Sequence, residues 1–474
     1  MAGHRPLFHN PKNKTGHRPG QDDRTDMATQ ISQGQAFQDR VSQRQPLTPE
    51  QQQLLAEGSL ADTAIQARPR EFYAAMRHGD PIHYDAKLGS WLVTRHEDIS
   101  AVQSDPVTFS VQHGYSEQQA RGMRDEFEAY LREHGGGYFP DAIMSDPPYH
   151  TRVRKLMERA FTAHRVKELE PRITEVVRGV IAEAVAKGGG QCDAVKDIAI
   201  PLTIRVIVEQ LGLDHGMEAQ ISRWSVAVTA QIGAMQTRET MLENAAQIAE
   251  LQQYLIARMK ACEENPGEDM ISDLVHAEVT NADGTTEKLT FAEAVSLVRA
   301  TLIAGNDTTA TAIGNLFHVL ATRPGMADLL ESVVDDERQL NRFIEEHLRS
   351  APPVRALSRM TTREVTVNGT TIPAHAHMLL VYGSGNDDES VFPEPRAFDI
   401  TRPNLGRHVA FGGGPHRCIG LALARMEVKV AAREIVRQMR DIRFAIPESD
   451  IRYTRSVATH TIESLPITFE KRVG

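Results

Sequence analysis

The stretch FGGGPHRCIG, from Phe411 to Gly420, places a cysteine between a run of glycines and a segment with helical apolar spacing. That segment, IGLALARMEVKVAAREIVRQM, predicts a helix that begins close to Cys418. The unpaired N–H groups and the dipole at a helix N-terminus stabilise a thiolate. Three consecutive glycines would also let the backbone approach a flat ligand closely. The stretch therefore predicts a ligand site around the Cys418 sulfur.

Four interpretations of this stretch compete. A phosphate-binding loop is disfavoured because neither GxGxxG nor a GKS or GKT ending is present. A zinc site lacks partners, since His416 lies two residues before Cys418 and no second cysteine is near. A structural role for Cys418 as a small buried apolar residue stays open. Its position favours a thiolate that ligates a metal or a haem, and the absence of CxxCH leaves a haem bound without a covalent link.

A long central helix is predicted from about Phe291 to Thr322. Thr290 and Glu293 have the spacing of a capping box, and Pro324 with Gly325 would end the helix. A helix of this length would measure about 48 Å. Its interior contains AGNDTT, residues 304–309, which is unfavourable for a helix because glycine lowers helix propensity and the polar side chains compete for backbone hydrogen bonds. This local conflict indicates a functional site.

The composition excludes several classes of protein. The chain has 474 residues and a formal net charge of -10, which argues against nucleic acid as the main partner. Its only cysteines, Cys192, Cys262 and Cys418, form no CxxC pair and no disulfide framework, which fits a reducing cytoplasm. Because no window approaches about 18 consecutive apolar residues and no signal-peptide core is present, we expect no membrane span.

Patterning predicts one large domain, residues 47–474, after a flexible N-terminal tail, residues 1–46, which has almost no apolar periodicity. Residues 81–99 predict two short strands followed by a helix. The pattern is predominantly helical from Pro148 to about Pro324, with turns at KGGG and EENPGED. Asn368 and Gly369 form the expected turn of a late hairpin. Whether translation starts at Met1 or Met27 stays open.

Four stretches together resemble the cytochrome P450 family. FGGGPHRCIG is similar to the haem-binding signature FxxGxxxCxG, with Phe411, Gly414, Cys418 and Gly420 at the matching positions. AGNDTT resembles the family's oxygen-activation motif, EHLR at 346–349 its ExxR motif, and FDITR at 398–402 the segment with a second arginine. The resemblance runs from about residue 80 to the end. It implies a mainly α fold with a minor β-rich subdomain, in which a long central helix lies over a haem.

The resemblance implies roles for residues around iron and oxygen. Cys418 would be the axial ligand of haem b, iron protoporphyrin IX, and Phe411 would cover the side of the haem that the sulfur ligates. Asp307 and Thr308 match the family's acid and alcohol pair, which would relay protons to dioxygen. Gly305 would leave room for the oxygen ligand beside the helix.

Cationic side chains would bind the haem propionates. His150 and Arg154 lie four residues apart on an expected helix, so they share one face, and they are similar to the HTRxR segment of bacterial members. Arg359 and His416 match two further haem-binding positions. A separate buried ion network, whose role would be to fix the haem-binding loop, is expected from Glu346, Arg349 and Arg402.

The implied function is a soluble, cytoplasmic haem-thiolate monooxygenase that inserts one atom of O2 into a hydrophobic small molecule. Since the chain shows no flavin or ferredoxin module, electrons from NAD(P)H would come through a separate ferredoxin reductase and ferredoxin, docked on Arg407, Arg417 and Arg425. We expect a monomer. Two alternatives are a peroxide-driven peroxygenase, which would not need the acid and alcohol pair, and a non-catalytic haem-thiolate sensor or binding protein.

The substrate pocket is the least determined part of the sequence. The candidate walls are mainly apolar and small, and are compatible with a terpene, steroid, alkane or aromatic compound. The insert at about 115–140, with GMRDEFEAYLREHGGGYFP, departs from compact bacterial members, and its role stays open. The expected walls are residues 105–145, Trp224–Met235, Leu302, Ala304 and Thr308, the strand Val354–Leu357, and Val457.

Overall fold

The computed structural model describes residues 46–111, 123–137, 145–161, 163–231, 236–267, 269–280 and 284–472. The chain divides into two units at Pro46, and the second, Leu47–Gly474, is compact. Of the tail predicted at 1–46, all but its last residue lies outside the described residues.

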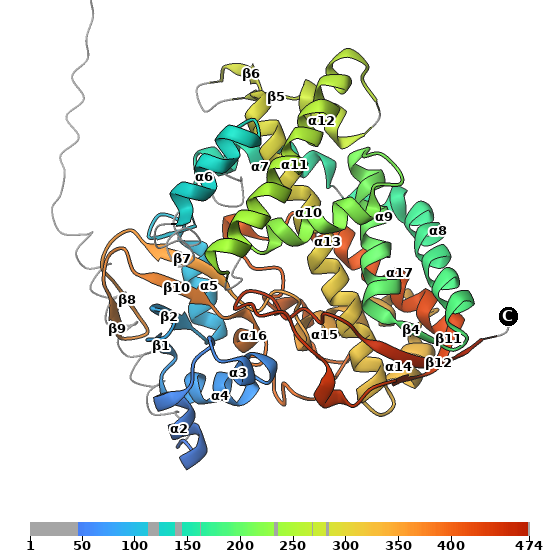
Figure 1. Cartoon of the computed structure of the whole chain (residues 1–474). Coiled ribbons are helices and arrows are strands. Elements are labelled where there is room, and N and C mark those ends of the chain that lie inside the picture. The colour runs from blue at the N-terminus through green and yellow to red at the C-terminus, as the bar shows by residue number, and fades with distance from the viewer. Residues whose placement is uncertain are drawn as a thin grey trace, which may run out of the picture. The chain divides into compact units, whose positions relative to one another are not determined.

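Helix α13, Phe291–Thr322, runs through the middle of this unit (Figure 1). Its capping box forms as predicted, because the N–H of Glu293 donates to Thr290 Oγ1 at 3.3 Å and the N–H of Thr290 donates to Glu293 Oε2 at 2.9 Å. Its first half, which includes Leu297, belongs to one hydrophobic cluster, and its second half, which includes Phe317, belongs to another. The predicted bounds of this helix are confirmed, and α13 is shared by the two largest hydrophobic clusters.

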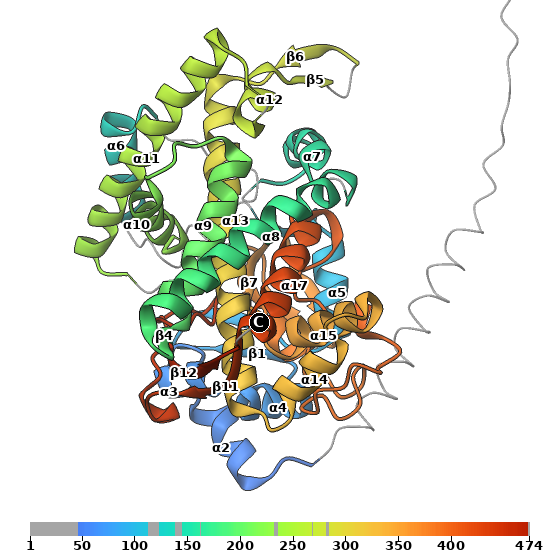
Figure 2. The same cartoon turned by 90° about the vertical axis from the view of Figure 1, so that its right-hand side faces the viewer.

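The other helices surround α13 in two groups that follow these clusters. Figure 2 shows α8 and α17 side by side against one part of α13, with α10 and α11 against another. The first group comprises α8 (Ala163–Gly188), α9 (Ile200–Leu211), α14 (Met326–Val333), α15 (Glu337–Ser350) and α17 (Leu421–Gln438). The second comprises α6 (Met123–His134), α7 (Tyr149–Ala160), α10 (Glu218–Thr229), α11 (Arg238–Glu264) and α12 (Met270–His276).

A five-stranded sheet joins the start of the domain to its late section. The strand order is β1-β2-β10-β7-β3, and only β10 and β2 pair in parallel among these neighbours. Asn368 and Gly369 form the predicted turn of the β8–β9 hairpin with φ of 45° and 80°, as a tight hairpin turn requires. The strands are β1 (Ile82–Asp85), β2 (Ser90–Val93), β3 (Phe109–Ser110), β7 (Leu357–Thr361), β8 (Val365–Val367), β9 (Thr370–Ile372) and β10 (His377–Leu380).

Short helices border this sheet. The predicted helix after the first two strands is α5, and a single turn of helix follows β10. Helix α2 has a capping box at Thr48, as α13 has at Thr290. These helices are α2 (Pro49–Glu57), α3 (Thr63–Ala67), α4 (Arg70–Gly79), α5 (His96–Ser104) and α16 (Tyr382–Gly385).

Two small sheets interrupt or follow the stretch that the sequence predicted as helical. Strand β4 (Gln191–Asp193) pairs with β12 (Pro466–Lys471), which pairs with β11 (Met439–Phe444), and β5 (Glu278–Thr280) pairs with β6 (Thr286–Lys288). The predominantly helical character predicted for this stretch is confirmed, and the three-residue strands β4, β5 and β6 within it were not predicted. Because β4 has three residues and its partner lies at the far end of the chain, no local pattern indicates it.

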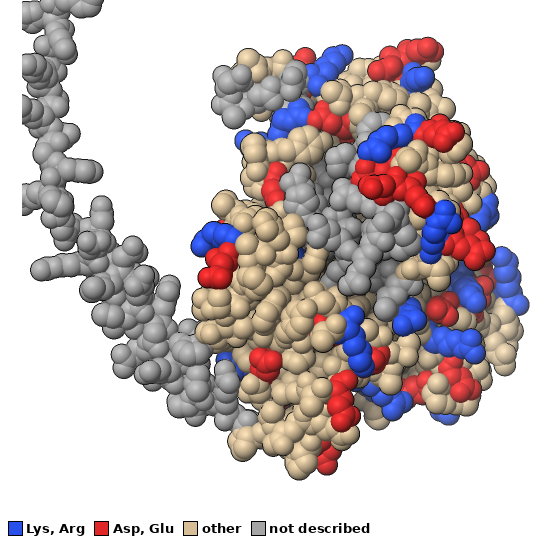
Figure 3. All heavy atoms as spheres, turned by 60° about the vertical axis from the view of Figure 1, so that its left-hand side comes forward, with Lys and Arg blue, Asp and Glu red and all other residues tan. Residues whose placement is uncertain are grey.

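The surface of the unit carries mixed charge. On the face shown in Figure 3, basic and acidic side chains are interspersed, with uncharged residues between them. Elsewhere in the unit, ion pairs such as Arg172–Glu209, at 2.6 Å, neutralise exposed charges. Within the described ranges, none of the helices combines the length and the apolar character that crossing a bilayer requires.

Candidate active site

The loop that carries Cys418 is closed by backbone hydrogen bonds before α17 begins. The N–H of Cys418 donates to the carbonyl of Phe411 at 2.9 Å, and Gly420 caps α17. Burial raises the pKa of the Cys418 thiol, although a hydrogen bond from the Gly420 N–H and the charges of Arg154 and Arg425 oppose this shift. Burial of the sulfur and the start of helix α17 thus act in opposite directions on this pKa.

The glycine run receives the end of helix α5. A Cβ on Gly413 would lie 2.3 Å from Gln103 Nε2, and a Cβ on Gly414 would lie 2.2 Å from the Gln103 carbonyl oxygen. Gly412 and Gly414 also have positive φ, 63° and 60°. Glycine is therefore needed at Gly413 and Gly414 for packing against helix α5, and the close approach of this backbone to a flat ligand stays a prediction.

We expect Gly414→Ala to lower the free energy of unfolding by about 2–3 kcal/mol, because the new Cβ would clash with a backbone carbonyl and hold a strained φ. Denaturant unfolding followed by circular dichroism measures the change. The control is Gly406→Ala, whose Cβ would meet no atom within 4 Å, and it should change the free energy by less than about 0.5 kcal/mol. Equal losses in the two variants would contradict the packing argument.

The cationic residues predicted for propionate binding are neighbours in the structure. The rings of His150, from α7, and His416 have centroids 4.1 Å apart. Burial, His150, Arg359 and Arg154 together lower the pKa of His416 to about 3. The guanidinium of Arg359, on β7, is buried beside Tyr382, and Arg154 donates to Glu158 at 2.9 Å. Positive and neutral nitrogen groups from three separate segments thus gather near Cys418.

The polar turn of α13 makes specific contacts with its neighbours. The Thr229 hydroxyl, from α10, donates to the Asp307 carboxylate, and burial raises the pKa of Asp307. The Thr308 hydroxyl donates to the Ala304 carbonyl at 2.7 Å. A Cβ on Gly305 would lie 3.1 Å from Ile207 of α9, so glycine also allows close packing of these two helices, and its role in oxygen access stays a prediction.

A fully buried ion network ties helix α15 to the segment 393–402. Arg349 donates twice to Glu346 at 2.7 Å, and Arg402 Nε donates to the same carboxylate at 3.2 Å. The two guanidinium groups also donate to backbone carbonyls of residues 386, 393, 394, 395 and 397. The trio that the family resemblance implied is thus brought together, and its cations are satisfied by one carboxylate and a set of carbonyls.

Comparison with known proteins shows the family. The family model described as Cytochrome P450 matches residues 223–440. The 6-deoxyerythronolide B hydroxylase of Saccharopolyspora erythraea is 31% identical over 404 residues, covering 84% of this chain and 95% of that protein. The Vitamin D(3) 25-hydroxylase of Pseudonocardia autotrophica is 32% identical over 408 residues, covering 85% of this chain and 94% of that protein. The chain belongs to the cytochrome P450 family.

The fold of this P450 agrees with solved members. The structure of cytochrome P450 CREJ in complex with (4-ethylphenyl) dihydrogen phosphate superposes with a TM-score of 0.78 at 26% identity. The similarity covers 85% of this chain and 98% of that chain. The predicted fold class is confirmed. The relatives are named hydroxylases, so this P450 is a monooxygenase of a family that binds haem through a thiolate and uses O2.

The described residues of the P450 fit a haem. His150 Nδ1 and His416 Nε2 are buried and have no hydrogen-bond partner among the residues that the structure describes. Asp146 is the nearest carboxylate to His416, at 4.0 Å. Buried ring nitrogens left open beside two arginines, Arg154 and Arg359, are suited to anionic carboxylates such as propionates when they carry a proton.

The residues predicted for the substrate pocket of the P450 have different environments. Leu302 is completely buried with Ile204 and Ile207 of α9, and its role as a pocket wall stays a prediction. Ala304 is exposed although it lies in the middle of α13, which indicates open space beside it. Val354, Leu357 and Val457 are half-buried. Parts of 105–145 and of 224–235 lie outside the described residues, but α6 forms within the insert and packs on α11.

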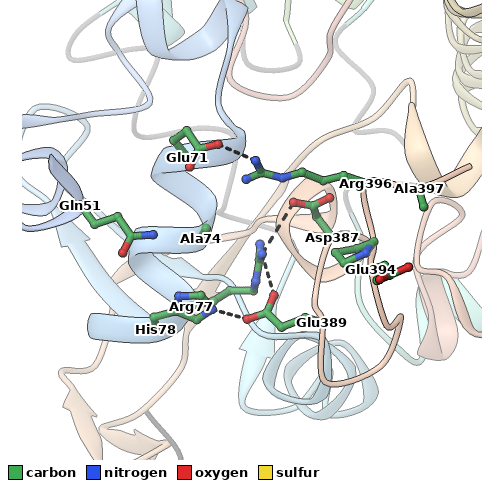
Figure 4. Close-up of a pocket in the computed structure, with 11 residues that line it drawn as sticks. Gln51, Glu71, Ala74, Arg77, His78, Asp387, Glu389, Glu394, Arg396 and Ala397 are labelled. Atoms are coloured by element: carbon green, nitrogen blue, oxygen red, sulfur yellow. Dashed lines mark hydrogen bonds and ion pairs between the residues drawn. The ribbon is translucent and has the colours of Figure 1, made fainter. Parts of the chain in front are cut away.

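The pocket in Figure 4 lies among α2, α4 and residues 387–397, and none of its lining residues belongs to the predicted site. Its volume is about 330 Å³. Arg77 pairs with Glu389 at 3.0 Å and with Asp387 at 3.6 Å, and Arg396 pairs with Glu71 at 2.6 Å. Because its charges pair with one another, we assign this pocket to stability.

We expect Glu389→Gln to lower the free energy of unfolding by about 1 kcal/mol at neutral pH. Burial opposes ionisation of Glu389, but the hydrogen bond from His78 and the charge of Arg77 outweigh burial and lower its pKa to about 2. Because the pKa of Glu389 is lower in the folded protein than its ordinary value of 4.5, its charge stabilises the fold fully above pH 4.5. This contribution is lost as the pH falls from 4.5 toward 2. The difference between variant and parent should therefore shrink from pH 6 to pH 3 in denaturant unfolding. A difference that stays constant over this range would contradict the assignment.

Sequence reasoning missed two contacts of the Cys418 loop. Gln103 of α5 fits against the glycines, and Glu345 of α15 binds Arg425. No sequence pattern indicates the first contact. The second contact joins residues that are 80 apart in the sequence, and the match of Glu346 in EEHLR indicates no partner for Glu345.

Proposed function

We propose that this P450 hydroxylates a hydrophobic small molecule, of the terpene, steroid, alkane or aromatic class, with electrons from NAD(P)H delivered by a ferredoxin reductase and a ferredoxin. The observation that carries the proposal is the half-buried Cys418 with His150, Arg154, Arg359 and His416 gathered near it. The relatives named above hydroxylate different substrates, as their names state. Sequence identity at this level supports the type of reaction, and the substrate has to be identified by experiment.

Different residues would ligate the iron, bind the propionates and transfer protons in such an enzyme. Cys418 Sγ would ligate the iron, and the four cationic or imidazole side chains would hold the propionates. Haem, when bound, supplies an iron centre that activates dioxygen with electrons from outside the chain. Asp307, whose pKa is raised by burial, would hold a proton at neutral pH more often than an exposed aspartate. Thr308, the next residue, would pass that proton on once its hydroxyl leaves the Ala304 carbonyl.

Redox partners would meet the exposed charges beside the Cys418 loop. Arg407 and Arg417 are exposed, as the docking hypothesis requires. Arg425 is half-buried and bound to Glu345, so we remove it from that hypothesis. Mutual attraction between such arginines and an acidic ferredoxin would speed encounter more than it would add affinity.

Spectral titration of the purified holoenzyme tests the proposal. Terpenes, steroids, alkanes and aromatic compounds are added in turn, and loss of the axial water is followed in the haem spectrum. Compounds that bind are then incubated with NADPH, ferredoxin reductase and ferredoxin, and O2 consumption and hydroxylated product are measured. Binding with coupled product formation supports the proposal. Product formation with hydrogen peroxide alone at the same rate would favour a peroxygenase, and binding without O2 consumption would favour a sensor.

A further inference from the structure

Helix α15 presents two consecutive carboxylates to two different loops. Side chains of adjacent helical residues diverge by about 100°. Glu346 accordingly binds Arg349 and Arg402, whereas Glu345 points to α17 and the Cys418 loop. Arg425 of α17 donates to both oxygens of Glu345, at 2.6 Å and 2.8 Å, although the two residues are 80 apart in the sequence. Such a bidentate pair fixes the plane of the guanidinium group.

His408 is the second partner of Glu345. The N–H of Ala410 donates to His408 Nδ1 at 3.2 Å, which leaves the proton of the neutral ring on Nε2. His408 Nε2 lies 3.0 Å from Glu345 Oε2 and can donate to it. The side chain of His408 is almost fully buried, so this contact is shielded from water. The start of the Cys418 loop is thereby tied to α15.

Arg425 extends the contact to the middle of the loop. Its guanidinium carbon lies 4.7 Å from the centre of the Phe411 ring, within the range of a cation–π interaction. The carbonyl of Phe411 accepts the N–H of Cys418 at 2.9 Å. A continuous path of contacts therefore runs from Glu345 through Arg425 and Phe411 to the residue that carries the sulfur.

The charges of this group are satisfied internally. Burial opposes ionisation of Glu345, but His408 and Arg425 outweigh it and lower the pKa of Glu345 to about 2. The side chain of Arg425 is 28% exposed, and that of Glu345 is 20% exposed. An arginine held in this way is a fixed part of the loop and offers little free charge to a docking protein.

We propose that Glu345, His408 and Arg425 form a clamp that positions Phe411 and, through it, the Cys418 loop. The inference rests on the proposed role of Cys418 as the haem ligand. The clamp residues are positioning residues, and they act on the sulfur only through Phe411 and the backbone.

The test compares Glu345→Gln and Arg425→Lys with Glu337→Gln. Glutamine keeps the size of Glu345 but loses one acceptor for Arg425, and lysine keeps the charge of Arg425 but loses the planar stacking. Glu337 is a matched control because it also joins α15 to α17, through Lys429 and Arg433, and both of these partners lie beyond the Cys418 loop. Two measurements are made on each holoprotein: the rate of haem transfer to apomyoglobin, and the stability of the thiolate signature in the reduced carbon monoxide complex.

We expect both clamp variants to transfer haem about tenfold faster than the parent and to lose the thiolate signature sooner, whereas Glu337→Gln keeps the parent's values. A parent without the thiolate signature would overturn the proposed function itself. A parent with the signature, and clamp variants that match the control, would overturn the clamp alone. If Glu345→Gln does not fold, the Arg425→Lys variant decides the question in the same two measurements.

Discussion

Replacement of Glu346 by alanine is expected to lower the free energy of unfolding by about 3–5 kcal/mol, because it leaves two buried guanidinium groups without their carboxylate. Glu346 is fully buried, and Arg349 and Arg402 are at most 5% exposed. The carbonyls that surround the guanidinium groups accept hydrogen bonds but carry no net charge. Denaturant unfolding of the holoprotein measures the loss, and haem content at purification should fall in parallel.

The matched control for this prediction is Glu331→Ala. Glu331 pairs with Arg472 through two contacts, as Glu346 pairs with Arg349, but its side chain is 48% exposed. Solvent screens an exposed pair, so this variant should lose far less stability than Glu346→Ala. Equal losses in the two variants would show that the buried network contributes little to stability.

The comparison of Glu345 with Glu346 shows how far the sequence alone could go. Glu346 and Arg349 are one helical turn apart, so a local pattern was enough to pair them. The partner of Glu345 lies 80 residues away, and the contact depends on how α15 and α17 pack. The same distinction separates the bounds of α13, which a local capping box sets, from strand β4, whose pairing is set by the other end of the chain.

Side-chain direction was harder to predict than helix position. Leu302 and Ala304 are two residues apart on α13, and apolar spacing does not tell which one packs on α9 and which one faces open space. The glycines of the Cys418 loop were likewise recognised as conformationally necessary, but Gln103, which requires two of them, comes from α5. In both cases the sequence does not show which residue of another helix lies against the position. That neighbour is known only once the helices are packed.

Replacement of Asp307 by asparagine is expected to slow dioxygen-dependent turnover about 100-fold, because asparagine cannot release a proton. Asparagine keeps the size of the side chain and can still accept the hydrogen bond from Thr229. Haem content and substrate binding should therefore stay at the parent's values. The measurement is the rate of product formation with ferredoxin, its reductase and NADPH, together with the fraction of consumed O2 that appears in product.

The pH dependence separates a proton donor from a structural aspartate. Burial raises the pKa of Asp307 while the Thr229 hydroxyl lowers it, so Thr229→Val should raise this pKa further. If Asp307 donates the proton, the parent's turnover rate falls as the pH rises through that pKa. In Thr229→Val this fall in rate occurs at higher pH, and in Asp307→Asn it is absent. The control is Asn306→Ala, which removes the bond between Asn306 and Thr203 at 2.6 Å and should leave the position of the fall unchanged. An Asp307→Asn enzyme with the parent's rate and pH profile would assign Asp307 to the packing of α10 on α13.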